Sequence, residues 1–384
     1  MKLKVILLML STILFYTSNT FGVNLKYLEK IDFASEVELL STPYSFCVTD
    51  DELYMIPDPE AGNIKIYGRK GTSLELVKII GKKGFGSGEL VKPTYCFYSK
   101  EENKFGVFDY VKRYIYIYDR IGGLNFELVK AIYCRALGYD ARLRVNKLLI
   151  SGYLDDQNGN PYDFYYVDIG ESIKGDSGKS YKTLTNYEPT FLLPSYVKYG
   201  LNSFSQYNTE YSKKPNIKAI GVKGWFDMHG DDVYFAWEGD RRIIKLNINS
   251  KKWTSLRKEI SQESNYKKPS ASAEYVKAWR LRDFKTVREE QLSKMSLVRN
   301  IFASSHYVLV IYQGPILPGR ESFWCQFFTL AGDFIKEVPI LNPPGLEMWF
   351  EFDKDKNILH SLSLGKDKEK DKKRYFILKH EITR

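Results

Sequence analysis

Two similar stretches decide the fold: Asp58-Pro-Glu-Ala-Gly-Asn-Ile64-Lys-Ile-Tyr67 and Asp109-Tyr-Val-Lys-Arg-Tyr-Ile115-Tyr-Ile-Tyr118. In each, an acidic residue precedes a turn, and an isoleucine then begins a run of alternating side chains that is typical of a β-strand. A Glu-Leu-Val-Lys segment follows both copies, at Leu74–Lys78 and Phe126–Lys130, and Glu238–Asn247 repeats the spacing once more. The first two copies lie about fifty residues apart, which indicates a repeat architecture.

A glycine-rich connection separates the first two copies: Gly81-Lys-Lys-Gly84-Phe-Gly86-Ser-Gly88-Glu-Leu-Val-Lys-Pro93. Its glycines permit a tight chain path, and Pro93 ends the excursion before a new strand. With this connection the chain resembles NHL-repeat propellers and related bacterial six-bladed β-propellers. The resemblance is strongest over residues 44–132, and a weaker match covers 220–260.

The resemblance implies an all-β fold, a six-bladed β-propeller of four-stranded blades. Counting strand runs outward from the repeat places the blades at about residues 44–80, 94–132, 136–190, 220–258, 297–341 and 345–380. This number is a count by pattern, and seven blades remain an alternative.

The ends of the chain predict how the ring closes. The last blade runs out of chain after its third strand, Arg374–Lys379, whereas Leu25–Phe33 is a strand without a blade. We therefore expect the N-terminal strand to complete the last blade, because this pairing removes the open edge that a linear array would leave.

Two insertions interrupt the repeat within a single predicted domain, residues 23–384. Residues 187–219 are rich in Tyr, Ser, Asn and Pro and predict a long loop. Residues 270–296 are charged with mixed apolar spacing and predict a helical insertion.

The N-terminus predicts export. Lys2 and Lys4 precede an apolar run from Val5 to Tyr16, which is too short to span a bilayer. Small residues stand just before the predicted cleavage site after Gly22. We expect residues 1–22 to be a signal peptide and the mature protein to be periplasmic or extracellular, without a membrane span. It is not expected to be a lipoprotein, because the first cysteine is Cys47.

The net charge of the chain is +10, but its basic residues are spread rather than clustered, so we expect no nucleic-acid partner. Four cysteines, Cys47, Cys96, Cys134 and Cys325, could pair in three ways, and the sequence does not choose among them. Cys47 and Cys96 occupy corresponding places in two repeats, which favours small buried side chains over a designed bridge.

The chain carries no catalytic motif that we can identify. Its four histidines, His229, His306, His360 and His380, form no close pair and no HExxH. The recurrent acids Asp58, Asp109 and Glu238 could converge near a channel and hold a divalent metal. Because they belong to the repeat itself, we favour the interpretation that each acid caps its own turn. We predict no cofactor.

These observations favour a non-enzymatic binding module, expected to be a monomer, whose ligand is a protein, a glycan or a small molecule. Glycan binding predicts exposed tryptophans on one face, among Trp225, Trp237, Trp279 and Trp324. The alternative is a metal-dependent hydrolase or lyase with its site at the channel. Under that alternative alone, Ca²⁺ or another divalent metal would be required.

Overall fold

A computed structural model describes residues 22–34, 43–133, 136–144, 147–154, 162–168, 182–184, 190–191, 224–237, 243–247, 249–250, 252–256, 286, 296–315, 323–340, 345–366 and 373–383. Every element in this part of the chain is a β-strand, so the all-β prediction is confirmed. The predicted signal peptide apart from Gly22, nearly all of both insertions, Cys134 and Glu238 lie outside the described residues. No helix within the described ranges is long and apolar enough to cross a membrane.

The strands of the two clearest repeats form two antiparallel groups. The first group comprises β2 (Cys47–Val48), β3 (Tyr54–Asp58), β4 (Asn63–Lys70) and β5 (Ser73–Ile80). The second comprises β6 (Pro93–Ser99), β7 (Lys104–Asp109), β8 (Tyr114–Gly122) and β9 (Asn125–Tyr133), to which β13 (Lys182–Leu184) adds in parallel.

The later repeats form further sheets. One contains β10 (Ala136–Arg144), β11 (Lys147–Leu154), β12 (Tyr162–Asp168) and β14 (Thr190–Phe191). The next contains β15 (Gly224–His229), β16 (Asp232–Trp237), β17 (Ile244–Asn247) and β18 (Lys252–Ser255). Another contains β19 (Leu297–Ala303), β20 (Val308–Gln313), β21 (Phe323–Phe328) and β22 (Phe334–Pro339). The final group is β23 (Gly345–Asp353), β24 (Ile358–Lys366), β25 (Lys373–Thr383) and β1 (Asn24–Phe33).

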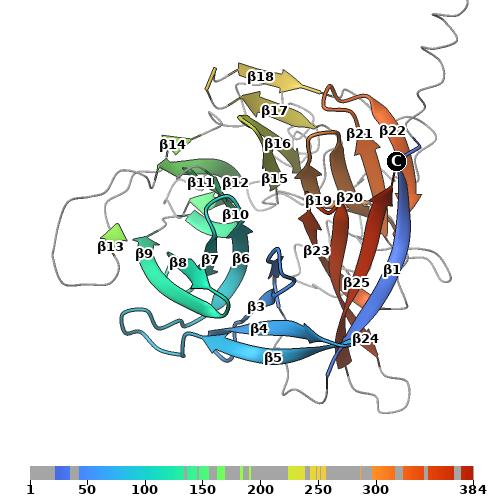
Figure 1. The fold of residues 1–384 in the computed structure, drawn as a ribbon. Helices are drawn as coiled ribbons and strands as arrows, with labels where there is room; N and C mark the ends of the chain where they lie inside the picture. Colours follow the sequence, from blue (N-terminus) through green and yellow to red (C-terminus); the bar gives the residue numbers. More distant parts are fainter. Residues whose placement is uncertain are drawn as a thin grey trace, which may run out of the picture.

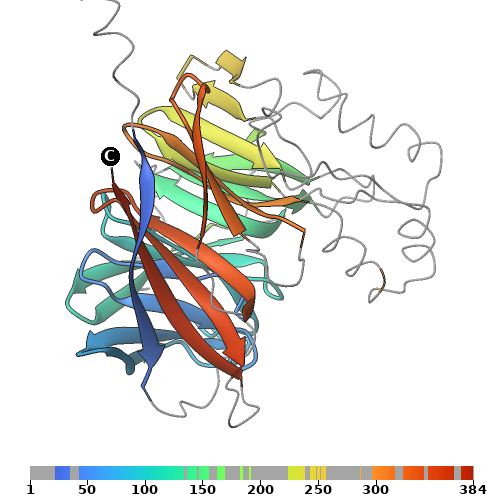
Figure 2. The ribbon, with the colours of Figure 1, turned by 90° about the vertical axis from the view of Figure 1, so that its right-hand side faces the viewer.

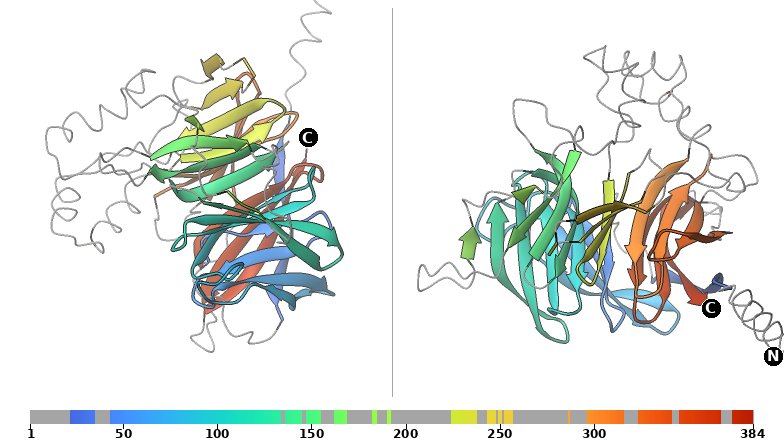
Figure 3. Two further views of the ribbon diagram at one scale, coloured as in Figure 1. Left: turned by 90° about the vertical axis from the view of Figure 1, so that its left-hand side faces the viewer. Right: turned by 90° about the horizontal axis from the view of Figure 1, so that it is seen from above.

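The sheets are arranged in a ring, with the first strand of each group nearest the centre (Figure 1). Each inner strand contacts the next: β2 with β6, β6 with β10, β10 with β15, β15 with β19, and β19 with β23. Because β23 also contacts β2, this series of contacts is circular. The views from the side and from above show the sheets following one another around this centre (Figures 2 and 3).

The ring closes through its two chain ends. β1 pairs antiparallel with β25 from Asn24–Thr383 to Asp32–Phe376, which places the N-terminal strand beside the last strand of the chain. At its other end β1 makes a short parallel pairing with β5, so that one sheet of eight strands spans the junction. The prediction that the N-terminal strand joins the last group is confirmed.

Alternating apolar side chains build the core between successive sheets. Ile64 and Ile66, from the repeat that identifies the fold, are fully buried, and the equivalent Ile115 and Ile117 are buried as well. Ile64 and Ile66 pack with Phe105 of the following group. The same residues that mark the repeat in the sequence therefore hold neighbouring sheets together.

A buried lysine ties the closure strands to the first group. Lys379 of β25 is 4 % exposed, and its Nζ lies 2.8 Å from Glu52 Oε1 and 3.1 Å from Glu29 Oε1. Arg69 of β4 donates two hydrogen bonds to the Glu29 carboxylate, at 2.7 and 2.8 Å. These bonds from Arg69, together with Lys379, hold the pKa of Glu29 below its ordinary value despite partial burial. Removing the lysine leaves Glu52 with Arg69 at 3.9 Å as its remaining cation.

We predict that Lys379→Met lowers the free energy of unfolding by about 2 kcal/mol, because the partly buried Glu52 carboxylate loses its closest cation while Glu29 keeps Arg69. Urea denaturation measures the loss. The matched control is Lys30→Met on β1, where the Lys30–Asp32 pair is exposed and its removal should cost less than about 1 kcal/mol. Equal losses in the two variants would contradict a special role for the closure cluster.

Candidate functional site

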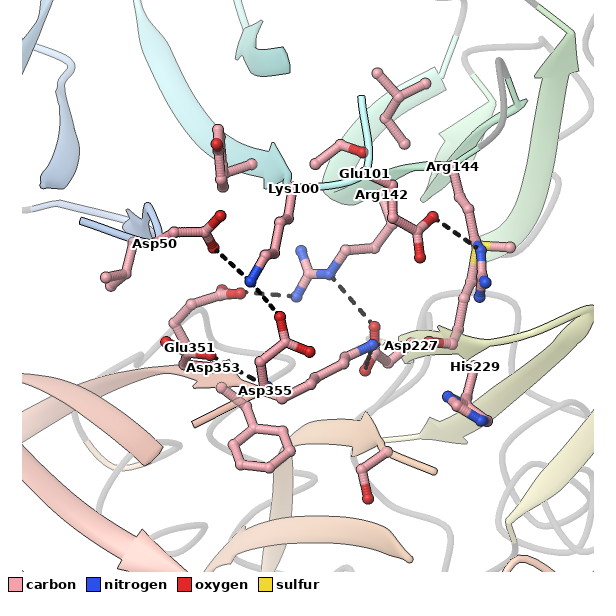
Figure 4. Close-up of a pocket in the computed structure, with 18 of the residues that line it drawn as sticks. Asp50, Lys100, Glu101, Arg142, Arg144, Asp227, His229, Glu351, Asp353 and Asp355 are labelled. Carbon is pink, nitrogen blue, oxygen red and sulfur yellow. Dashed lines mark hydrogen bonds and ion pairs between the residues drawn. The ribbon is translucent and has the colours of Figure 1, made fainter. Parts of the chain in front are cut away.

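A cavity of about 600 Å³ opens at one end of the ring, where the innermost strands end. Each inner strand or the turn that follows it contributes to the wall, so residues far apart in the chain meet there (Figure 4). The lining residues are Val48, Asp50, Tyr98, Ser99, Lys100, Glu101, Arg142, Leu143, Arg144, Asp227, Met228, His229, Ser304, Ser305, Glu351, Phe352, Asp353, Lys354 and Asp355.

The hairpin turns that follow the inner strands present the charged side chains of the pocket. Four of these turns contain a residue in the left-handed conformation: Glu52, Asn103, Gly230 and Asn357, with φ between 50° and 61°. Asn, Asp and Gly tolerate this conformation and are common in tight turns. Because the turns have similar geometry, they bring the side chains beside them to the same end of the ring.

Three charged side chains form the floor of the pocket: Arg142, Asp227 and Glu351. They hold the same register position in β10, β15 and β23, two residues before the last paired residue of each strand. Arg142 Nε lies 3.9 Å from Asp227 Oδ1, and Arg142 Nη2 lies 3.9 Å from Glu351 Oε2. Both distances exceed a hydrogen bond, so the guanidinium lies between the two carboxyls without clasping either one.

Closer partners neutralise two of the floor charges. Arg142 Nη1 lies 2.7 Å from Asp140 Oδ1, and Asp140 in turn accepts the backbone N–H of Ala141 at 2.9 Å. On the other side of the floor, Lys354 Nζ lies 2.7 Å from Asp227 Oδ2, which also accepts the backbone N–H of Ala303 at 2.8 Å. These two pairs fix the geometry of the floor.

Glu351 has a weaker set of contacts. Its side chain is 21 % exposed and faces the pocket, and the 3.9 Å approach to Arg142 is the closest ion pair that it makes within the described part of the chain. Burial raises the pKa of Glu351 to about 7; Asp227 and Asp140 add to the rise, while Arg142 and Lys354 oppose it. Near neutral pH this carboxyl therefore gains or loses a proton readily.

The rim of the pocket is lined by exposed ion pairs. Lys100 contacts Asp355 and lies 3.3 Å from Asp50, which joins turns of the second, last and first groups. Arg144 Nε lies 3.2 Å from Glu101 Oε2. Such exposed pairs contribute little stability, but they give the rim a defined pattern of charge.

The four histidines have different environments. His229 lines the pocket, where burial and the nearby Lys354 and Arg144 lower its pKa. His360 is buried, its pKa falls to about 3 mainly through burial, and its Nδ1 lies 3.3 Å from the Tyr54 hydroxyl. His380 is buried and His306 is exposed, and neither lines the pocket.

Two of the recurrent acids, Asp58 and Asp109, are not among the residues that line the pocket, and both bind backbone N–H groups of turns. Asp109 is fully buried and accepts backbone N–H groups of Val91, Lys92, Val111 and Lys112. Asp58 accepts the N–H of Ala61 at 3.0 Å and pairs with Lys65 at 2.7 Å. Asp58 and Asp109 therefore have the contacts that turn capping predicts, and Glu238 lies outside the described residues.

Among the described residues, no group of three His, Cys, Asp or Glu side chains is arranged to hold a metal ion. Cys47, Cys96 and Cys325 are buried free thiols. Trp225 and Trp324 do not line the pocket: Trp225 donates a hydrogen bond to the Val298 carbonyl at 3.1 Å, and Trp324 is partly buried. Trp279 and the side chain of Trp237 lie outside the described part of the chain. The aromatic lining residues are Tyr98 and Phe352.

Comparisons with known proteins support the fold. No family model matches the chain, and no curated protein matches it in sequence. A crystal structure of a protein from Bacteroides fragilis, assigned as exported, is 12% identical with a TM-score of 0.55, over 95% of this chain and 97% of the other. A member of the DUF4221 family from Bacteroides vulgatus is 10% identical with a TM-score of 0.57, over 94% and 99% of the two chains. Identities this low show similarity of fold alone.

Sequence reasoning missed Arg142, Asp227 and Glu351, because none of them belongs to the repeat that identifies the fold. A usable signal exists beside them. Charged residues recur in the first turn of several repeats, as in Asp50-Asp51-Glu52, Lys100-Glu101-Glu102 and Asp353-Lys354-Asp355. Turns that are equivalent in a ring meet at one end, so these clusters indicate where a charged pocket forms.

We predict that Glu351→Gln changes the pH dependence of stability. The pKa of Glu351 is about 7 in the folded protein against an ordinary value of 4.5, so the folded state holds this proton more tightly. The stability from this group is full below about pH 4.5, falls as pH rises through that window, and is lost above about pH 7. Relative to the wild type, the variant should therefore gain up to about 3 kcal/mol between pH 4.5 and pH 8. Urea denaturation at pH 4.5, 6 and 8 measures the gain, and a constant difference across these values would contradict it.

We predict that Asp109→Asn lowers the free energy of unfolding by about 2 kcal/mol, because an amide has one acceptor oxygen where the carboxylate uses two. Asp32→Asn is the control, since Asp32 is half-exposed and pairs only at the surface with Lys30. Its effect should stay within about 0.5 kcal/mol. A similar small effect at Asp109 would argue against its role as a turn cap.

Proposed function

We propose that this chain is an exported, non-enzymatic six-bladed β-propeller that binds a small polar ligand in the pocket at the end of its ring. The observation that carries the proposal is the pocket itself, which is lined by all of the inner strands or their turns and has charged residues on its floor. Ligand sites prefer concave places where several elements converge, with a few well-placed polar groups that orient the ligand.

Support for six blades comes from dividing the eight-stranded sheet at its short parallel junction between β1 and β5. The two halves then have four strands each, β2 to β5 and β23 to β1, as do the sheets between them apart from the added strand β13. This division supports four-stranded blades, closed by the N-terminal strand, in one domain over residues 23–384. In such a ring the pocket is the mouth of the central channel.

Export is supported by the apolar N-terminal run and its basic start, and by the fold shared with a Bacteroides fragilis protein assigned as exported. We propose a periplasmic or extracellular location without a lipid anchor. In that location the ligand would be a component of the envelope or of the surrounding medium.

The floor of the pocket fits a binding site better than it fits the metal centre of a hydrolase or lyase. A divalent metal prefers several carboxylate oxygens around one point. Here Asp227 already pairs with Lys354 and accepts the Ala303 N–H, and Asp140 already pairs with Arg142. These carboxylates hold cations of the protein itself, which gives a patterned surface for a charged or polar ligand.

We predict that blocking the pocket abolishes stabilisation by small polar compounds. Ser305 lines the pocket and is exposed, so Ser305→Trp fills space without removing a charge. The control Thr72→Trp lies in the exposed turn between β4 and β5. We would measure the melting temperature with 1,6-diaminohexane, 1,6-hexanediol, adipate, glucose and glycine, each at millimolar concentration.

At least one of these compounds should raise the melting temperature of the wild type and of Thr72→Trp, and leave Ser305→Trp unchanged. The proposed function is overturned if no compound stabilises the wild type, or if all three proteins respond equally. Calorimetric titration of each stabilising compound gives the dissociation constant and the stoichiometry, which should be about one.

A further inference from the structure

The floor of the pocket contains one carboxyl more than its close cations can neutralise. Arg142 pairs with Asp140 and Lys354 pairs with Asp227, each at 2.7 Å. Glu351 remains, with Arg142 Nη2 at 3.9 Å. When Glu351 is ionised, the floor counted together with Asp140 and Lys354 therefore holds three negative and two positive groups, and a buried charge of this kind calls for a counter-charge.

The pocket as a whole has the opposite charge to the rest of the chain. The net charge of the chain is +10, yet six acidic and four basic side chains line the pocket. A concave site focuses the field of the groups that line it, so this pocket attracts cations even though the protein is basic. Selection for a cationic ligand is the simplest reason for such a contrast.

We propose that the pocket recognises its ligand through a primary ammonium group, which lies against the carboxylate of Glu351 and completes the charge balance of the floor. This inference rests on the proposed function and specifies the chemical class of its ligand. An ammonium has three donors and no acceptor, so it suits a carboxylate that faces open space. Tyr98 and Phe352, also in the lining, offer apolar surface to the carbon skeleton of such a ligand.

Ligand binding is then coupled to the proton on Glu351. The groups that face this carboxyl are Arg142 and Asp140 from β10, Asp227 from β15 and Lys354 from the turn after β23. Two further titratable side chains lie close to it. The buried thiol of Cys47 on β2 has a pKa raised well above its ordinary value, first by burial, and His360, opposite on β24, has a pKa lowered to about 3, so both are neutral at pH 7. His229 also lines the pocket, and burial with the nearby Lys354 and Arg144 lowers its pKa, so it too is neutral at pH 7. Glu351 is thus the group in this cluster that changes charge near pH 7.

The test compares three probes with one carbon skeleton: 1,6-diaminohexane, 1,6-hexanediol and adipate. Calorimetric titration at pH 8 should show the diamine binding wild-type protein at least about tenfold more tightly than the diol, and adipate should not bind. Below pH 6 the affinity for the diamine should fall about tenfold per pH unit, because the proton on Glu351 must leave. At pH 7, titration in buffers of different ionisation enthalpy should show about half a proton released for each diamine bound.

Glu351→Gln removes the charge and keeps the shape of the side chain. It should lose at least about tenfold in affinity for the diamine at pH 8, bind the diol unchanged, and show no pH dependence between pH 6 and pH 8. The control is Glu75→Gln, whose side chain is exposed on β5 and pairs with Lys70 far from the pocket. This control should match the wild type with all three probes.

The outcomes separate this inference from the proposed function. If the diol or adipate binds as tightly as the diamine, and Ser305→Trp abolishes that binding, the pocket binds small ligands but the ammonium class is wrong. If none of the probes binds the wild type and the five-compound panel also gives no stabilisation, the proposed function itself fails. If the diamine binds equally well to Glu351→Gln, recognition does not involve Glu351 and the inference is overturned.

Discussion

The structure depends on the antiparallel pairing of β1 with β25, from Asn24–Thr383 to Asp32–Phe376. This ladder of backbone hydrogen bonds converts a row of sheets into a ring and covers an edge of β25 that would otherwise be open. Lys379 strengthens the junction from inside, since it lies between Glu29 of β1 and Glu52 beside the first group. A ring that is closed in this way brings the first and last groups together, and both contribute side chains to the pocket.

The charged floor exists only because the ring is closed. Arg142, Asp227 and Glu351 come from three separate sheets. Arg142 pairs with Asp140 of its own strand, and the other contacts among these charges join different sheets. Placing charges in a buried site is unfavourable unless partners surround them. The packing of the apolar sheets therefore supplies the free energy that holds these groups together. The charged floor itself lowers the stability of the fold, and the apolar core offsets this cost.

The sequence predicted the parts of the molecule that recur. The strands marked by the repeated isoleucines are buried, at Ile64, Ile66, Ile115 and Ile117. The N-terminal strand β1 pairs with the last strand β25, as the incomplete final repeat predicted. Asp58 and Asp109 bind their turns, as repeated acids do when they serve the fold. The pocket could not be predicted in the same way, because Arg142, Asp227 and Glu351 are single residues that differ between repeats. Periodicity reveals what repeats share, whereas a site in a ring is built from what they do not share.

The pairing of the first strand with the last also sets an order of events during synthesis. β1 is synthesised before the other described strands, whereas its partner β25 begins only at Lys373. Contacts between residues so distant in sequence form late, because a long loop must close before they are made. β1 would thus remain without its main partner until β25 is available. During that interval its exposed edge can pair with other chains, so β1 is the strand most open to aggregation before the ring closes.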